Sequence, residues 1–151
     1  MNSRFAWWSA CLVSGLVAGC GGGPSKISLV GAYGLNPDET GQPRPVKARV
    51  YKLKDSRRFL ESPMEAVWVE DKKTLAEDWI EDPQVLTVIP GDKPEEVGLG
   101  ELGGDVKFIG VMALISDMPQ GEDTRRVVVP AKEVDGAVFE LTGYRVVLRT
   151  E

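Results

Sequence analysis

The side chains that could do chemistry in this 151-residue chain are carboxylates and cysteines, because the sequence contains no histidine. Without histidine there is no Ser-His-Asp triad, no Cys-His dyad and no zinc site built on imidazole. An acid/base pair for glycoside hydrolysis would have to come from carboxylates, and the candidates are Glu95, Glu96, Glu101 and Asp105. All four stand in turn-like sequence within two residues of glycine or proline, where acidic side chains simply keep a surface soluble. The sequence therefore indicates a protein that is not an enzyme.

The first cysteine-containing segment has the pattern of a secretory signal peptide. Residues 5–19 carry no charge and follow the single basic residue Arg4, and small residues stand at the end of the segment. The apolar stretch is short for a bilayer span, which needs about 20 residues; a retained short membrane helix is the alternative. Cleavage after Gly19 would remove residues 1–19 and make Cys20 the first residue of the mature chain.

Cys20 is then expected to be a lipid attachment point. The only other cysteine, Cys11, lies in the segment that would be removed, so the exported chain would keep one unpaired thiol. Residues 17–20, "VAGC", resemble a bacterial lipobox, whose cysteine takes a diacylglycerol. A buried core cysteine is the alternative, but the surrounding glycines give it nothing to pack against. We expect a covalent lipid on Cys20, no other cofactor, and a flexible Gly-rich tether over residues 20–25.

Residues 26–151 are expected to form one all-β domain. Strand-like segments rich in β-branched residues alternate with turn signals, and they cover residues 26–35, 45–54, 84–89, 95–102, 106–115, 124–130, 137–141 and 144–149. About eight short strands favour a sandwich of two antiparallel sheets. The nearly continuous apolar run 106–115 predicts a central strand that is buried on both faces. The turns "PGDKP" and Thr142-Gly143 each predict a hairpin.

Two features interrupt this β pattern. Residues 55–80 predict a small helical excursion on one edge of a sheet, between the second and third strands, and Ser62-Pro63-Met64-Glu65 has the form of a capping box with Pro63 at the first helical position. Within 45–54 the apolar alternation changes phase at Val50-Tyr51, which a β-bulge would explain.

The segment 36–45 predicts an exposed loop, because its three prolines and one glycine exclude a helix or a central strand. Long loops of this kind often carry function. Its oxygen-bearing residues Asn36, Asp38 and Thr40 have the spacing of a calcium loop, but Lys47 stands where a bidentate glutamate should be. Turn chemistry accounts for the loop residues without a metal ion.

The net charge of −5 argues against nucleic acid as a partner.

The lipobox, the first strand and "LNPDETGQPRPVKARVYKLKD" (35–55) together resemble the type VI secretion lipoprotein family TssJ (SciN, VasD). In that family an Asn-x-Asp-x-x-Gly-x-Pro-x-Pro loop leads into a strand that ends in Arg-x-Tyr-x-Leu. The matching positions here are Asn36, Asp38, Gly41, Pro43, Pro45, Arg49, Tyr51 and Leu53. The likeness continues through "TLAEDW", "VIPGD" and "FIGVMALISD", so it covers nearly the whole mature chain.

The resemblance implies a transthyretin-like sandwich that hangs from the outer membrane into the periplasm. It also implies a structural role: to tether the C-terminal periplasmic domain of TssM within the type VI secretion membrane complex. The residues implied to contact TssM are those of the loop between the first two strands: Asn36, Pro37, Asp38, Glu39, Thr40, Gly41, Gln42, Pro43, Arg44 and Pro45. An aspartate directly after the lipidated cysteine would resemble the inner-membrane retention signal of some bacteria. Gly21 stands at that position here, which favours the outer membrane.

Two other functions stay open on the residues alone. A periplasmic binding module for a small hydrophobic or peptide ligand would need an apolar cavity between the sheets. A lipid-anchored hydrolase would need its carboxylates to converge in a cleft.

Overall fold

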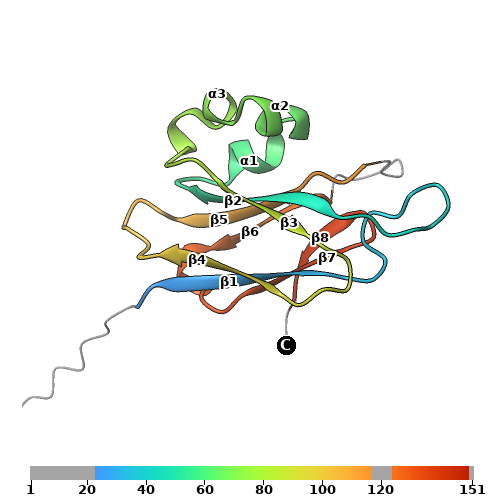
Figure 1. Ribbon diagram of the computed structural model, residues 1–151. Coiled ribbons are helices and arrows are strands. Elements are labelled where there is room, and N and C mark those ends of the chain that lie inside the picture. The colour runs from blue at the N-terminus through green and yellow to red at the C-terminus, as the bar shows by residue number, and fades with distance from the viewer. Residues whose placement is uncertain (1–22, 117–123, 150–151) are drawn as a thin grey trace, which may run out of the picture.

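Two four-stranded sheets pack face to face in the computed structural model, which describes residues 23–116 and 124–149 (Figure 1). Cys20 and the predicted signal peptide lie outside these residues. The strand orders are β4-β1-β7-β8 and β3-β2-β5-β6. The strands are β1 (Ser25–Gly31), β2 (Val46–Leu53), β3 (Gln84–Val88), β4 (Glu95–Gly100), β5 (Phe108–Ala113), β6 (Arg126–Pro130), β7 (Val138–Thr142) and β8 (Arg145–Leu148). The predicted all-β sandwich is confirmed.

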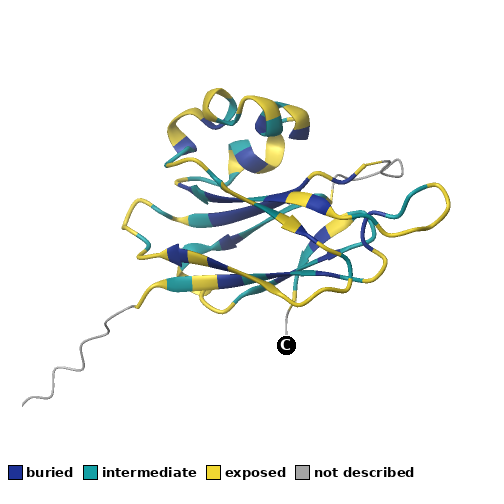
Figure 2. Cartoon of the chain, viewed as in Figure 1, coloured by how far each residue is buried: buried dark blue, intermediate teal, exposed yellow. Residues whose placement is uncertain are grey.

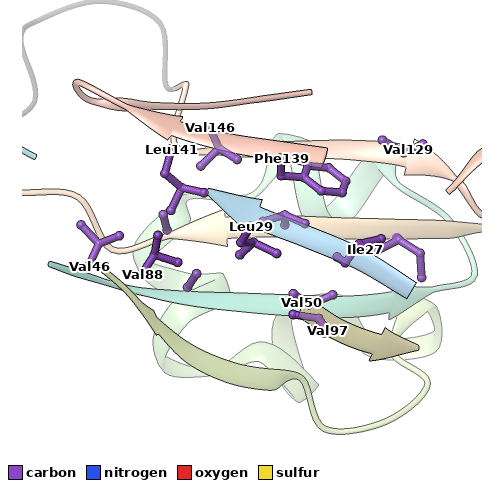
Figure 3. Close-up of a cluster of buried hydrophobic side chains, with 14 of the residues drawn as sticks. Ile27, Leu29, Val46, Val50, Val88, Val97, Val129, Phe139, Leu141 and Val146 are labelled. Atoms are coloured by element: carbon purple, nitrogen blue, oxygen red, sulfur yellow. The ribbon is translucent and has the colours of Figure 1, made fainter. Parts of the chain in front are cut away.

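The space between the sheets is filled by apolar side chains from the inner face of every strand (Figure 3). Buried positions accordingly recur along the strands (Figure 2). Leu29 of β1 lies at the centre of this space, in register with Phe139 of β7, and Ile27 lies nearer the start of the strand. Full burial of side chains of this size stabilises a fold by about 1.5–3 kcal/mol each. The central position of β5, which is buried along most of its length, agrees with the prediction for residues 106–115.

The chain between β2 and β3 forms a helical layer that covers the outer face of the second sheet (Figure 1). It consists of α1 (Arg57–Glu61), α2 (Met64–Val69), α3 (Asp71–Leu75) and the 3-10 turn η1 (Ala76–Asp78); a second 3-10 turn, η2 (Ala131–Glu133), follows β6. The helical excursion is confirmed, but it lies over a face rather than along an edge. Its Phe59 and Val67 pack on Tyr51 and Met112 in a second core.

The predicted capping box does not form. Helix α2 begins at Met64, its N-cap is Pro63, and no side chain caps it. The backbone at Ser62 is extended, with ψ 151°, and the Pro63 carbonyl accepts hydrogen bonds from the N–H groups of Ala66 and Val67. Because the helix starts one residue later than a capping box requires, Ser62 is left outside it.

The predicted bulge in the second strand is also absent. Strand β2 pairs in unbroken register with β3 and with β5. Val50 faces the core between the sheets, whereas Tyr51 and Leu53 belong to the core beneath the helices. The change of phase at Val50-Tyr51 therefore reflects a strand that is buried on both faces.

Strands β3 and β4 do not form the predicted hairpin, since they belong to different sheets. β3 pairs with β2, and β4 pairs with β1. The connection crosses over the end of β1, where the Gly91 N–H donates to the Gly31 carbonyl at 2.8 Å. A Cβ at Gly31 would lie 2.6 Å from the Ile89 carbonyl oxygen, so only glycine allows this close approach.

The second predicted hairpin, β7–β8, is confirmed, and Gly143 takes the positive φ of its turn. One pairing departs from a purely antiparallel pattern. β1 pairs antiparallel with β4 on one side and parallel with β7 on the other. The first strand is thereby held inside its sheet on both edges.

Candidate partner-binding loop

The loop 36–45 joins β1 to β2 and projects from the end of the sandwich toward which β1 runs (Figure 1). The described chain enters at the other end, where Ser25 pairs with Gly100. The point of entry and the candidate loop therefore lie at opposite ends of the first strand.

The root of the loop is buried and closed by hydrogen bonds. Leu35 is fully buried and Asn36 is 4% exposed. The Asn36 N–H donates to the Gly143 carbonyl at 2.7 Å, and the Arg44 N–H donates to the Leu35 carbonyl at 3.0 Å. The Arg44 guanidinium Nε–H donates to the Asn36 carbonyl at 3.1 Å. The two bonds of Arg44 hold the ends of the loop together, and the bond to Gly143 ties the loop to the β7–β8 turn.

The tip of the loop is organised around one carboxylate. Asp38 Oδ1 accepts from the Thr40 N–H at 2.8 Å, from the Thr40 hydroxyl at 2.7 Å and from the Gln42 N–H at 3.0 Å. Gly41 supplies the positive φ of 82° that this turn requires. The hydrogen bond from the Thr40 side chain is the main reason why the pKa of Asp38 lies below its ordinary value. The carboxylate therefore stays ionised and keeps these bonds at neutral pH.

The ten residues of the predicted contact set differ in exposure. Asn36 is buried, and Pro37, Asp38 and Arg44 are half-buried. The exposed members are Glu39, Thr40, Gly41, Gln42, Pro43 and Pro45. Direct contact with another molecule is available mainly to the continuous exposed stretch 39–43, whereas the buried and half-buried members shape the loop.

Two residues that brace the loop were not predicted. The Ser116 N–H donates to Asn36 Oδ1 at 3.1 Å, and the Tyr144 hydroxyl donates to the Pro37 carbonyl at 3.4 Å. They lie 80 and 107 residues away along the chain. No local sequence pattern signals contacts at such separations.

The calcium interpretation finds no support in this geometry, because Asp38 Oδ1 is used to close the turn and accepts three hydrogen bonds from the loop itself. Within residues 23–116 and 124–149, no group of three or more histidine, cysteine, aspartate or glutamate side chains is arranged to hold a metal ion.

The carboxylates proposed for hydrolysis are all exposed: Glu95 and Glu96 on the edge strand β4, and Glu101 and Asp105 in the segment that follows it. Glu96 forms an ion pair with Lys26 at 3.0 Å, in which both side chains are more than half exposed. This is the arrangement of ordinary surface charges rather than of an acid/base pair in a cleft.

An apolar groove of about 630 Å³ lies at the end of the sandwich where the described chain enters. Its lining includes Leu102, Val106, Phe108, Pro130 and Ala131. It opens beside the β4–β5 connection and is not a cavity between the sheets.

None of the helices in the described part of the chain is long and apolar enough to cross a membrane.

Comparison with known proteins finds a family model, "Type VI secretion lipoprotein, VasD, EvfM, TssJ", that matches residues 24–149. The fold is similar to the T6SS lipoprotein TssJ1 from Pseudomonas aeruginosa, with TM-score 0.69, 25% identity and coverage of 85% of this chain and 98% of that one. It is also similar to a chain of a structure described as "Type VI membrane complex", with TM-score 0.74, 27% identity and coverage of 85% and 98%.

A third similar chain belongs to a structure described as "T6SS protein TssM C-terminal domain" from EAEC, with TM-score 0.72, 24% identity and coverage of 85% and 99%; at that identity the likeness concerns the fold alone. No curated protein matches the chain at a significant level.

Proposed function

Because the chain belongs to the type VI secretion lipoprotein family, we propose that it is a lipid-anchored structural component of the type VI secretion membrane complex. In this proposal it tethers the C-terminal periplasmic domain of TssM to the outer membrane, and its role is structural rather than enzymatic. The similarity to a chain of a type VI membrane complex supports the assembly. The choice of TssM as the partner rests on the family resemblance of the loop and the strand that follows it.

The anchor in this proposal is the sequence before the first strand. Residues 1–19 would be removed as a signal peptide, Cys20 would carry the lipid, and residues 20–25 would form the tether ahead of the domain at 26–151. The step from Cys20 to Ser25 spans at most about 17 Å of extended chain. The start of β1 would therefore stand close to the membrane surface. One acyl chain anchors only marginally, and two or more hold a protein stably.

The observation that carries the proposal is the position of the loop 36–45 at the far end of β1 from this tether (Figure 1). A protein that links a membrane to a partner needs its anchor and its binding surface on different sides. The exposed tip, residues 39–43, has this position. It is held by bonds to Asp38 and restricted by Pro43, so little conformational entropy would be lost on binding.

The test is to shorten the tip by replacing residues 39–43 with two glycines, and to measure binding to the purified C-terminal periplasmic domain of the TssM encoded nearest to the gene. We expect saturable binding by the unchanged protein and at least tenfold weaker binding by the shortened one. The bonds at the root of the loop stay in place, so the melting temperature should change by only a few degrees.

A matched control changes exposed residues at the opposite end of the sandwich, Glu101→Ala with Asp105→Ala, and should bind like the unchanged protein. If the shortened protein unfolds, the loop is structural and the site assignment is wrong. If the unchanged protein is folded and does not bind the folded TssM domain, the tethering role is wrong.

The second candidate, a carrier of a small hydrophobic or peptide ligand, is favoured by one observation, the apolar groove beside Leu102 and Phe108. The filled space between the sheets argues against it. Binding of a fluorescent fatty acid that is lost in Leu102→Glu would favour this carrier.

A further inference from the structure

Asn36 differs from its neighbours in the loop. It is one of two buried polar or charged residues among those the structure describes, the other being Asp78. It is also one of two described non-glycine residues with a positive φ, at 47°. Asparagine tolerates this conformation better than most residues. A buried polar side chain costs free energy unless its hydrogen bonds are satisfied.

The bonds of Asn36 join three connections that are distant in sequence. Its N–H donates to Gly143 in the β7–β8 turn at 2.7 Å. Its side-chain Oδ1 accepts from Ser116, just after β5, at 3.1 Å. Its carbonyl accepts from Arg44, at the far end of its own loop, at 3.1 Å. One residue thus contacts both ends of its own loop and two other segments.

We infer that Asn36 is a positioning residue for partner binding: it fixes the root of the loop 36–45 against the β7–β8 turn and the segment after β5, so that the tip 39–43 is presented in one orientation. This inference rests on the proposed function, because it assigns to Asn36 a role in the same TssM contact. Asn36 is buried and shapes the surface that the partner contacts, without contacting the partner itself.

A simpler interpretation is that Asn36 is present only because the turn needs a positive φ. The two interpretations differ in the side chain. Glycine would keep the backbone conformation and remove the Oδ1 acceptor. Aspartate would keep an acceptor at the same place. The pair Asn36→Gly and Asn36→Asp therefore separates the hydrogen bond to Ser116 from the φ requirement.

The experiment uses the full-length protein purified in detergent, with amide hydrogen exchange read residue by residue and binding to the TssM C-terminal periplasmic domain measured on the same samples. In Asn36→Gly we expect the Ser116 amide to exchange at least about tenfold faster. Loss of one buried hydrogen bond should weaken binding roughly threefold to tenfold. Asn36→Asp should restore slow exchange at Ser116 and most of the affinity.

Each result decides a separate question. If Ser116 exchanges at the unchanged rate in Asn36→Gly, the hydrogen bond does not hold the loop, and the inference is overturned. It is also overturned if exchange accelerates while the affinity stays the same. If the unchanged protein does not bind TssM, the proposed function fails and partner positioning fails with it, while exchange at Ser116 still reports whether Asn36 fixes the loop. A melting temperature near that of the unchanged protein shows that the variants are folded.

Discussion

Arg49 of β2 is a charged residue that joins the sheet to the helical layer. Its guanidinium lies 4.1 Å from the centre of the Trp68 ring and donates to the Trp68 carbonyl at 2.7 Å. It also donates to the Tyr51 hydroxyl at 3.2 Å and lies 3.7 Å from the Asp71 carboxylate. Its Nε is buried without a hydrogen-bond partner. The favourable contacts of the terminal guanidinium nitrogens must offset that cost.

Replacing Arg49 should therefore destabilise the fold strongly. Arg49→Leu leaves the Trp68 carbonyl without its donor and removes the ion pair with Asp71, and we expect a loss of about 2–3 kcal/mol in the free energy of unfolding. Arg49→Lys keeps the charge but cannot bridge all the acceptors, so its loss should be smaller. Urea denaturation measures both. The exposed pair Lys26–Glu96 provides the control, because Lys26→Leu should change stability by less than about 1 kcal/mol.

Tyr51 gives the stability a dependence on alkaline pH. Burial is the main cause that raises its pKa to about 12, from 10.0 for an ordinary tyrosine. Since the folded state holds the proton more tightly, this contribution is complete below pH 10 and is lost as the pH rises toward 12. The difference in unfolding free energy between the unchanged protein and Tyr51→Phe should be constant from pH 7 to 9. It should then shrink by up to about 1.4 kcal/mol per pH unit. A constant difference up to pH 11.5 would contradict the assignment.

At the scale of elements, the helical layer packs closely on the second sheet where β5 has a glycine, Gly110. A Cβ at Gly110 of β5 would lie 2.9 Å from the Phe59 ring of α1 and 3.1 Å from Leu53. The Phe59 ring in turn lies 5.5 Å from the Tyr51 ring. The absence of a side chain at Gly110 is what lets α1 approach the strands.

Gly110→Val should push α1 away and destabilise the protein by about 1–3 kcal/mol through overpacking. Faster hydrogen exchange in residues 57–61, together with the urea midpoint, would measure the effect. Gly98 of the edge strand β4 is the matched position, since nothing lies within 4 Å of its Cβ. Gly98→Val should leave the helices unchanged, and equal losses in the two variants would argue against docking through Gly110.

The positions of the strands could be predicted from the sequence, but not all of their partners. Runs of β-branched residues between turn signals located all eight strands to within a few residues. The prediction of a β3–β4 hairpin was wrong because "PGDKP" has the composition of a hairpin turn. The local sequence does not reveal that the two strands pair in different sheets. The prediction of a bulge in β2 was wrong because the sequence of one strand does not reveal a second core on its other face.

The candidate site was also predictable only in part, because local sequence patterns do not show contacts between distant segments. Proline and glycine marked residues 36–45 as a loop, since their effect on the backbone is local. The burial of Asn36 and its bond to Ser116 depend on segments that meet only after folding. The sequence therefore predicts that residues 36–45 form an exposed loop, but not the contacts that hold this loop in place.

For the whole molecule, the proposed anchor is the feature with the clearest cellular consequence. Cys20→Ser should prevent lipidation, because the serine hydroxyl does not replace the thiol as the lipid acceptor. We expect the protein to move from the membrane fraction to the soluble periplasmic fraction, and type VI secretion to stop. Fractionation followed by immunoblotting measures the first effect, and release of a secreted substrate measures the second.

Cys11→Ser is the matched control, because that residue would be removed with the signal peptide, and it should leave both results unchanged. A Cys20→Ser protein that still sediments with membranes would count against the lipid anchor.

The pairing of β1 on both of its edges has a mechanical consequence. Tension between the tether and a partner held at the loop would pull along the axis of this strand, since Ser25 and the loop lie at its two ends. Its hydrogen bonds to β4 and β7 run across that direction. They would carry the load in shear, all at once, and would not open one after another as in a strand peeled from one end. The fold is thus built to resist force along the line on which a tether would be pulled.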